Sequence, residues 1–254
     1  MTKPIIPWIG GKRRLAKHLL PLFPDHKCYV ELFSGGAALF FMKDQSDTEV
    51  INDINGDIVN LYRVIKYHLT AFHEEFRRAL ISREMYEWAK ITPPETLTDI
   101  QKAARFYFLQ KMAFGGKVES RSFGVAPSSK PRMNLLRMEE DISEAHLRLS
   151  RVYIEKLPWD KCLLKYDRDY SFFYADPPYW ETEGYGVEFG LDQYEALAEH
   201  ATTIKGKLLI SLNDHPEMRR IFGGFNISTV QIPYTVGGSK KSNKKSIELI
   251  IKNY

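Results

Sequence analysis

Four consecutive residues, Asp176-Pro177-Pro178-Tyr179, have the types and spacing needed to bind a flat ring that carries an amino group. Asp176 supplies carboxylate oxygens that accept hydrogen bonds. Pro177 and Pro178 stiffen the turn and lack N–H donors, so the carbonyls of the turn are free to accept. Tyr179 adds an aromatic face for stacking. The tetrapeptide therefore suits a planar amino-bearing substrate, although a strand-to-loop turn capped by an aspartate also explains these residues.

The elements that must position Asp176 can be predicted from the surrounding pattern. The apolar run at residues 172–175 predicts a short buried strand that ends at this aspartate. Residues 28–43 predict a strand, a turn with Gly35 and Gly36, and a helix. This order is typical of a doubly wound α/β sheet, whose ligand lies at the carboxyl ends of the strands. The turn lacks the glycine spacing of a dinucleotide fingerprint or a P-loop.

Two acidic residues indicate which ligand this sheet edge binds. Glu31 puts a carboxylate where a pyrophosphate would lie, which disfavours a dinucleotide and favours a ligand with a cationic group. A second strand at residues 49–52 ends at Asp53, about 20 residues after the glycine turn, where an acidic residue usually holds ribose hydroxyls. Asp53 could instead cap the following helix, for which Asn55 and Asp57 are also available. The offset favours the ribose role.

The N-terminal segment carries a second pair of glycines beside a basic residue. Gly10 and Gly11 let the backbone approach a ligand or take positive φ. Leucine spacing over residues 15–22 then predicts a helix that stops at Pro24. Lys12 would lie near the start of this helix, where a cation is poorly placed for the helix dipole. It therefore either faces solvent or meets an anion.

The alternation of strands and helices stops between residues 67 and 150. Apolar spacing there predicts three helices, near residues 72–80, 100–112 and 142–149. We therefore expect an α/β domain of residues 1–62 and 151–254, interrupted by a mostly helical insertion of residues 63–150. A final hairpin is expected to pair residues 225–234 with residues 247–251.

Two loops rich in basic residues are candidates for nucleic-acid contacts, although solvated loops would have the same composition. They contribute Lys117, Arg121, Lys130 and Arg132 in the insertion, and Lys240 and Lys241 in the final hairpin. Lysine and arginine in such loops would meet phosphates or base edges. The net charge of +4, from 36 Lys and Arg against 32 Asp and Glu, permits nucleic-acid binding but does not require it.

Composition excludes several other classes of protein. Cys28 and Cys162 are too few for a disulfide scaffold, and buried thiols in a reducing cytoplasm are expected. No apolar run has the length of a signal peptide core or a membrane span, so a cytoplasmic protein without membrane contact is expected. The residues show no metal-ligand spacing, and no metal is expected.

Four separated motifs carry a resemblance to a known family. They are residues 8–12 (Trp-Ile-Gly-Gly-Lys), residues 31–36 (Glu-Leu-Phe-Ser-Gly-Gly), Asp53 and residues 176–179, with the insertion between the third and the fourth. This order resembles the Dam-type DNA adenine-N6 methyltransferases of the D12 class, alpha group, over nearly the whole chain. The resemblance implies a Rossmann-like methyltransferase sheet with a helical target-recognition insertion. It also implies S-adenosyl-methionine as cofactor and double-stranded DNA as partner. A monomer or weak dimer is expected.

The resemblance also assigns roles within the site. Cofactor contacts are expected at Trp8, Gly10, Lys12, Glu31, Phe33, Gly35, Gly36, Asp53, Leu157, Trp159 and Asp176. Glu31 would lie near the methionine end, Asp53 would hold the ribose, and Leu157, Pro158 and Trp159 would contact the adenine of the cofactor. In catalysis, Asp176 and the Pro177 carbonyl would accept the two amino hydrogens of a flipped adenine, with Tyr179 stacked on the base.

The insertion departs from the family pattern. GATC-reading relatives usually carry Arg-Tyr-Asn followed by Pro-Phe-Gly-Arg, and residues 117–132 contain neither stretch. We therefore predict a different or relaxed target site. Methylation of the cytosine amino group is the nearest alternative, but serine is commoner than Asp176 for that activity. RNA or glutamine-amide methylation goes more often with asparagine there, and a non-catalytic DNA-binding protein would not need an intact motif.

Overall fold

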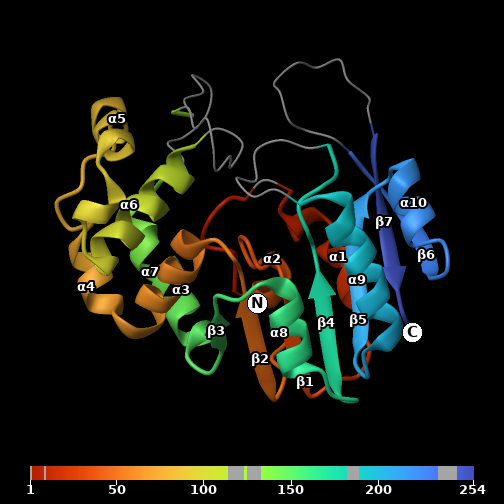
Figure 1. Ribbon diagram of the computed structural model, residues 1–254. Helices are drawn as coiled ribbons and strands as arrows, with labels where there is room; N and C mark the ends of the chain where they lie inside the picture. The colour runs from red at the N-terminus through yellow and green to blue at the C-terminus, as the bar shows by residue number, and fades with distance from the viewer. Residues whose placement is uncertain (1, 9, 114–122, 125–132, 182–188, 234–244) are drawn as a thin grey trace.

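A mixed β-sheet forms the centre of the protein (Figure 1). The computed structural model describes residues 2–8, 10–113, 123–124, 133–181, 189–233 and 245–254. Within these residues, seven strands lie in the order β3-β2-β1-β4-β5-β7-β6. The strands are β1 (Cys28–Glu31), β2 (Thr48–Asn52), β3 (Tyr153–Glu155), β4 (Ser171–Ala175), β5 (Lys207–Asn213), β6 (Asn226–Pro233) and β7 (Lys245–Lys252). The predicted α/β fold class is confirmed.

Strand direction changes across the sheet. Strands β3, β2, β1, β4 and β5 are parallel, and β7 runs antiparallel between β5 and β6. The predicted final hairpin is therefore confirmed as β6 and β7. Chain order reverses between β1 and β4, and in sheets of this type ligands bind outside the carboxyl ends of the strands at that point. Glu31 ends β1 and Asp176 directly follows β4, so both carboxylates lie at this edge.

Side chains alternate between two apolar layers. Tyr29 and Phe172 pack with the helices on one face, whereas Val30 and Phe173 pack with the helices on the other. Figure 1 shows helices α8 (Trp159–Tyr166) and α9 (Leu191–Thr203) over the near face. Both faces of the parallel strands are thus covered, as expected from their continuous apolar runs.

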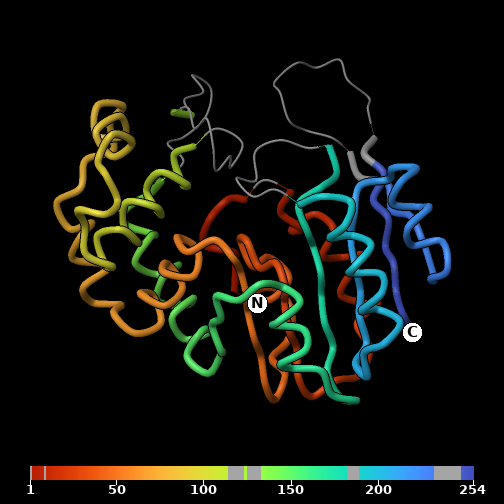
Figure 2. The backbone as a smooth tube through the Cα atoms, in the orientation of Figure 1, coloured from red at the N-terminus to blue at the C-terminus, as the bar shows by residue number. Residues whose placement is uncertain are grey.

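A group of helices lies beside the β3 edge of the sheet, visible on the left in Figure 2. It comprises α3 (Gly56–Tyr67), α4 (Leu69–Glu74), α5 (Arg83–Ile91), η3 (Pro94–Thr96), α6 (Asp99–Met112) and α7 (Leu135–Leu149). Helix α3 contacts both α6 and α7. The Thr98 hydroxyl caps α6 in a reciprocal pair with Gln101. The division at residues 62 and 63 stays a prediction, and both residues lie within α3.

Several short elements differ from the expected ones. The predicted N-terminal helix is broken into η1 (Lys12–Arg14), α1 (Ala16–Leu19) and η2 (Leu20–Leu22), because no side chain caps it and Pro21 lies near its end. Helices α2 (Ala38–Met42) and α10 (Pro216–Ile221) complete the described set. The sequence pattern did not indicate α5, α8 or α10. None of the described helices has the length and apolarity required to cross a bilayer.

Candidate active site

A cavity of about 650 Å³ opens at the carboxyl ends of the parallel strands. Most of the predicted site residues line it: Trp8, Lys12, Glu31, Phe33, Gly35, Gly36, Asp53, Leu157, Trp159, Asp176 and Pro178. Three others lie beside it. The Gly10 carbonyl accepts a hydrogen bond from Lys12 Nζ at 3.2 Å, Pro177 is buried, and Tyr179 contacts Lys12. The size suits a nucleoside-sized ligand.

Asp176 lines the cavity and belongs to a network of charged and polar side chains. Its Oδ1 atom is 2.8 Å from the Lys12 ammonium and 3.4 Å from the Ser211 hydroxyl. Burial raises the pKa of Asp176 to about 6, although Lys12 opposes the shift. The Tyr179 hydroxyl accepts from Lys12 and donates to Glu248. Asp176 is therefore held in place by contacts from β5 and the N-terminal segment.

Lys12 meets an anion and is buried, with 4 % of its side chain exposed. Its partner is Asp176 rather than a ligand phosphate, and Glu248 Oε2 lies 4.0 Å away. Glu248 was missed in the sequence. The available signal was a carboxylate within the apolar strand 247–251, since such a group is buried only with a partner.

Glu31, the last residue of β1, is buried. Its Oε1 atom accepts hydrogen bonds from the Tyr29 hydroxyl and the Phe40 N–H, both at 2.7 Å. Burial raises the pKa of Glu31 to about 7, against these two bonds. Among the described residues, the hydrogen bonds to this carboxylate reach Oε1, so Oε2 is available to a ligand in the cavity that Glu31 lines.

Asp53 is fixed by backbone groups rather than acting as the cap of α3. Its Oδ2 accepts from Gly35 N at 2.8 Å and its Oδ1 from Asn55 N at 2.9 Å. The Asn55 side chain caps α3 by accepting from Asp57 N. Burial raises the pKa of Asp53, and the N–H groups oppose that shift. Because the capping role is taken by Asn55, the Asp53 oxygens can also accept ligand hydroxyls.

The glycine turn is shaped by Trp8. A Cβ atom at Gly35 would lie 2.5 Å from Trp8 Nε1, and one at Gly36 would lie 2.9 Å from Trp8 Cβ. Gly35 also has a φ of 46°, in the left-handed region. The absence of side chains at Gly35 and Gly36 thus makes room for the Trp8 side chain, and the glycines do not serve only to let a ligand approach.

We expect a Gly35→Ala variant to lose about 2 kcal/mol or more of unfolding free energy, from the positive φ and the contact with Trp8. Thermal denaturation followed by circular dichroism would measure the loss. Gly224→Ala is the matched control, because a Cβ there would meet nothing within 4 Å. Equal melting temperatures for the two variants would contradict this account.

Aromatic and apolar side chains line the other part of the cavity. Phe33 lies between Trp159 and Phe189, with ring centroids 6.3 and 5.5 Å away. Trp159 Nε1 donates to Gln193 Oε1 at 3.0 Å, which fixes the indole. Phe189 and Gln193 were not predicted, because they follow a segment that gives no periodic signal. These side chains could accept the flat face of an adenine, while Trp159 stacking stays a prediction.

Comparison with known proteins identifies the family. A family model described as D12 class N6 adenine-specific DNA methyltransferase matches residues 8–236. The chain belongs to this family. Its reaction is accordingly methyl transfer to the N6 amino group of adenine in DNA, as the motifs predicted, and the cytosine and non-catalytic alternatives are set aside.

Relatives of this methyltransferase are similar to it along nearly their whole length. The type II methyltransferase M.CviBI of Paramecium bursaria Chlorella virus NC1A is 27% identical over 263 residues, covering 99% of this chain and 100% of the relative. The DNA adenine methylase of Haemophilus influenzae is 28% identical over 267 residues, covering 98% and 92%. The DNA adenine methylase of Escherichia coli K12 is 23% identical over 271 residues, covering 98% and 94%.

The predicted DNA contacts of the methyltransferase lie outside the described residues: Lys117, Arg121, Lys130, Arg132, Lys240 and Lys241. The described residues on either side of positions 114–122 nevertheless lie together. Gly124 N donates to Met112 O at 2.9 Å, and Ala113 and Phe123 form an antiparallel bridge. The Phe123 ring packs on Tyr86 of α5 at 5.3 Å between centroids. Within the described part of the chain, no group of three His, Cys, Asp or Glu is arranged to hold a metal.

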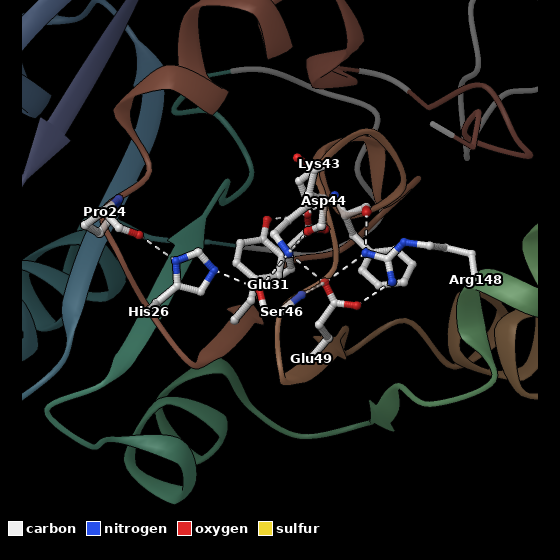
Figure 3. A network of polar contacts seen from close by, with 10 residues as sticks. Pro24, His26, Glu31, Lys43, Asp44, Ser46, Glu49 and Arg148 are labelled. Carbon is white, nitrogen blue, oxygen red and sulfur yellow. Dashed lines mark hydrogen bonds and ion pairs between the residues drawn. The ribbon is translucent and has the colours of Figure 1, made fainter.

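A buried ionic network connects the methyltransferase site to α7 (Figure 3). Glu49 on β2 is bound by both terminal nitrogens of Arg148 and by Lys43 Nζ at 2.6 Å. Arg148 Nη2 also donates to the Phe40 carbonyl at 2.8 Å. Phe40 in turn donates its N–H to Glu31. The network therefore fixes α2, from which Glu31 receives one of its two hydrogen bonds.

Proposed function

We propose that the protein transfers a methyl group from S-adenosyl-methionine to adenine N6 in duplex DNA, with the flipped base bound at residues 176–179. The observation that supports this most directly is that Asp176 borders a nucleoside-sized cavity that the carboxylates of Glu31 and Asp53 also line. An acceptor beside such a cavity can receive an amino hydrogen from a base while the cofactor fills the remainder.

The residues present fit S-adenosyl-methionine in type and order. Phe33, Phe189 and Leu157 would contact the adenine of the cofactor, Asp53 its ribose hydroxyls, and Glu31 the ammonium of its amino-acid tail. When bound, the cofactor would supply an electrophilic methyl group on a sulfonium sulfur. A buried carboxylate with a spare oxygen suits an ammonium group because the pair is charge-assisted.

Asp176 would then act on the adenine amino group. Its carboxylate accepts one amino hydrogen, and the Pro177 carbonyl is the expected second acceptor. The Pro178 carbonyl is already occupied by the Tyr194 hydroxyl. The Lys12 ammonium can move from Asp176 towards Glu248 when the amino group of the base binds to Asp176. With a pKa near 6, Asp176 can also take the proton that the nitrogen releases on methylation.

The target sequence is proposed to differ from GATC or to be relaxed. Residues 117–132 lack the stretches typical of GATC readers, and the described Phe123 among them pairs with Ala113 after α6 and packs on Tyr86 of α5. Lys117, Arg121, Lys130 and Arg132 would reach the DNA from there, with Lys240 and Lys241 on the final hairpin. Phosphate contacts by these residues would make binding salt-dependent.

Purified protein incubated with methyl-labelled S-adenosyl-methionine and unmethylated duplex DNA would test the proposal, with sequencing of the product for modified bases. N6-methyladenine in one short context would support the reaction and identify the site. Methylation of most adenines would support the reaction and a relaxed target. Transfer to RNA alone, or to no nucleic acid while S-adenosyl-homocysteine binds, would overturn the DNA assignment.

The ionisation of Glu31 gives the cofactor site a pH dependence. Because its pKa is about 7, Glu31 is mostly neutral at pH 6 and mostly ionised at pH 8. Only the ionised form attracts an ammonium group, so the Kd for S-adenosyl-homocysteine should be about tenfold higher at pH 6 than at pH 8. Equilibrium binding over this range would measure it. Glu31→Gln should bind weakly without this dependence, and 5′-methylthioadenosine, which lacks the ammonium, should show none. A flat profile for the wild type would contradict the assignment.

A further inference from the structure

The charged residues that line the cavity do not all neutralise one another. Lys12 pairs with Asp176 at 2.8 Å, and Asp53 accepts from backbone N–H groups. Two other cations line the cavity, Arg13 and Lys111. Arg13 is exposed to water, whereas Lys111 is half-buried in the last turn of α6.

Lys111 lacks an anionic partner within the part of the chain that the structure describes. Its Nζ lies 5.4 Å from the centroid of the Tyr107 ring, and Asp141 acts on it only through the longer-range field. Burial lowers the pKa of Lys111, as expected for an ammonium removed from water without compensation. An anion that entered the cavity would remove this cost.

The position of Lys111 is fixed from the N-terminal segment. The adjacent residue on α6, Gln110, donates from Nε2 to the Pro7 carbonyl at 2.9 Å. Pro7 and the next residue, Trp8, also line the cavity, and Trp8 packs against Gly35 and Gly36 of the glycine turn. The end of α6 is thus held at the cavity by a direct hydrogen bond to one of its walls.

We propose that Lys111 binds the carboxylate of the cofactor's amino-acid tail; this rests on the proposed use of S-adenosyl-methionine. The tail is a zwitterion, so a pocket that takes its ammonium on Glu31 must also satisfy a carboxylate. A buried carboxylate requires a cation or several N–H donors. Lys111 supplies that cation from the helical group between β2 and β3, so cofactor binding would engage this group as well as the sheet.

A pair of ligands that differ only in the carboxylate tests this assignment. S-adenosyl-homocysteine carries the group, and its decarboxylated form, 5′-(3-aminopropylthio)-5′-deoxyadenosine, keeps the ammonium. Isothermal titration of the full chain would give both Kd values. Lys111→Met should weaken S-adenosyl-homocysteine binding about 10- to 100-fold and change binding of the decarboxylated ligand by less than about threefold. Lys111→Arg should retain most of the affinity.

Two variants serve as controls. Lys102→Met makes the same substitution on α6 at a lysine 4.0 Å from Asp99, away from the cavity, and should leave both Kd values unchanged. Arg13→Met removes the other cation. The melting temperature of Lys111→Met should not fall, because an uncompensated buried charge is removed.

Other outcomes would overturn the assignment. Equal losses for both ligands in Lys111→Met, a selective loss in Arg13→Met instead, or a higher KM for DNA with unchanged S-adenosyl-homocysteine binding would each exclude Lys111 as the carboxylate ligand. Failure of the wild type to bind either ligand would overturn the proposed cofactor as well as the role of Lys111. That outcome is distinguishable from the others, which concern Lys111 alone.

Discussion

An Asp176→Asn variant should lose about 10²- to 10³-fold in kcat for adenine methylation while remaining folded. Asparagine keeps the shape of the side chain but removes its charge and turns one acceptor into a donor. The amino group of the base would then meet an N–H₂ group or a single neutral oxygen. Lys12, now 2.8 Å from the Asp176 carboxylate, keeps Glu248 as an anion nearby, so the buried ammonium is not left alone.

Single-turnover methyl transfer, together with titration of S-adenosyl-homocysteine, would separate chemistry from binding. We expect the loss in the transfer rate to exceed any change in Kd. Asp214→Asn is a matched control, since Asp214 follows the neighbouring strand β5 and pairs with Arg219 at 2.6 Å outside the cavity. A transfer rate for Asp176→Asn close to that of the control would refute the role of Asp176 as acceptor.

The sequence predicted the parts of the site that follow one another along the chain. The strand before Asp176, the glycine turn and the strand before Asp53 each have a local apolar pattern, and the parallel sheet brings their ends to one edge. These residues line a single cavity, as expected from their positions at strand ends. The local pattern was sufficient for these residues because the parallel sheet brings the ends of its strands together.

The sequence could not predict contacts between distant segments. The partner of Lys12 is Asp176, and the hydroxyl between Lys12 and Glu248 belongs to Tyr179. These contacts depend on how β7 inserts between β5 and β6, which no local spacing encodes. Helix α8 was missed for a different reason, because its N-cap is Pro158 without a side-chain cap.

A Glu49→Gln variant should lower the free energy of unfolding by about 3 to 5 kcal/mol, or the melting temperature by roughly 6 to 20 °C. Glutamine keeps the size of Glu49 but leaves two buried cations, Arg148 and Lys43, facing each other without an anion. Burial opposes ionisation of Glu49, yet the bonds from these cations outweigh it and hold the pKa below its ordinary value of 4.5. Thermal denaturation by calorimetry would measure the loss.

Further substitutions show whether unpaired charge causes that loss. Adding Arg148→Met to Glu49→Gln removes one of the two cations, so the double variant should regain part of the stability lost in the single variant. Glu140→Gln breaks an exposed pair with Arg137 on α7 and should change the melting temperature little.

The stabilisation by Glu49 should also depend on pH. Because the pKa of Glu49 is depressed, its contribution to the free energy of unfolding is full above about pH 4.5 and disappears as the pH falls through the folded-state pKa. The wild type and Glu49→Gln should therefore converge in acid. If the two proteins instead differ in melting temperature by the same amount at all pH values, the network stabilises α2 and Glu31 by packing rather than by charge.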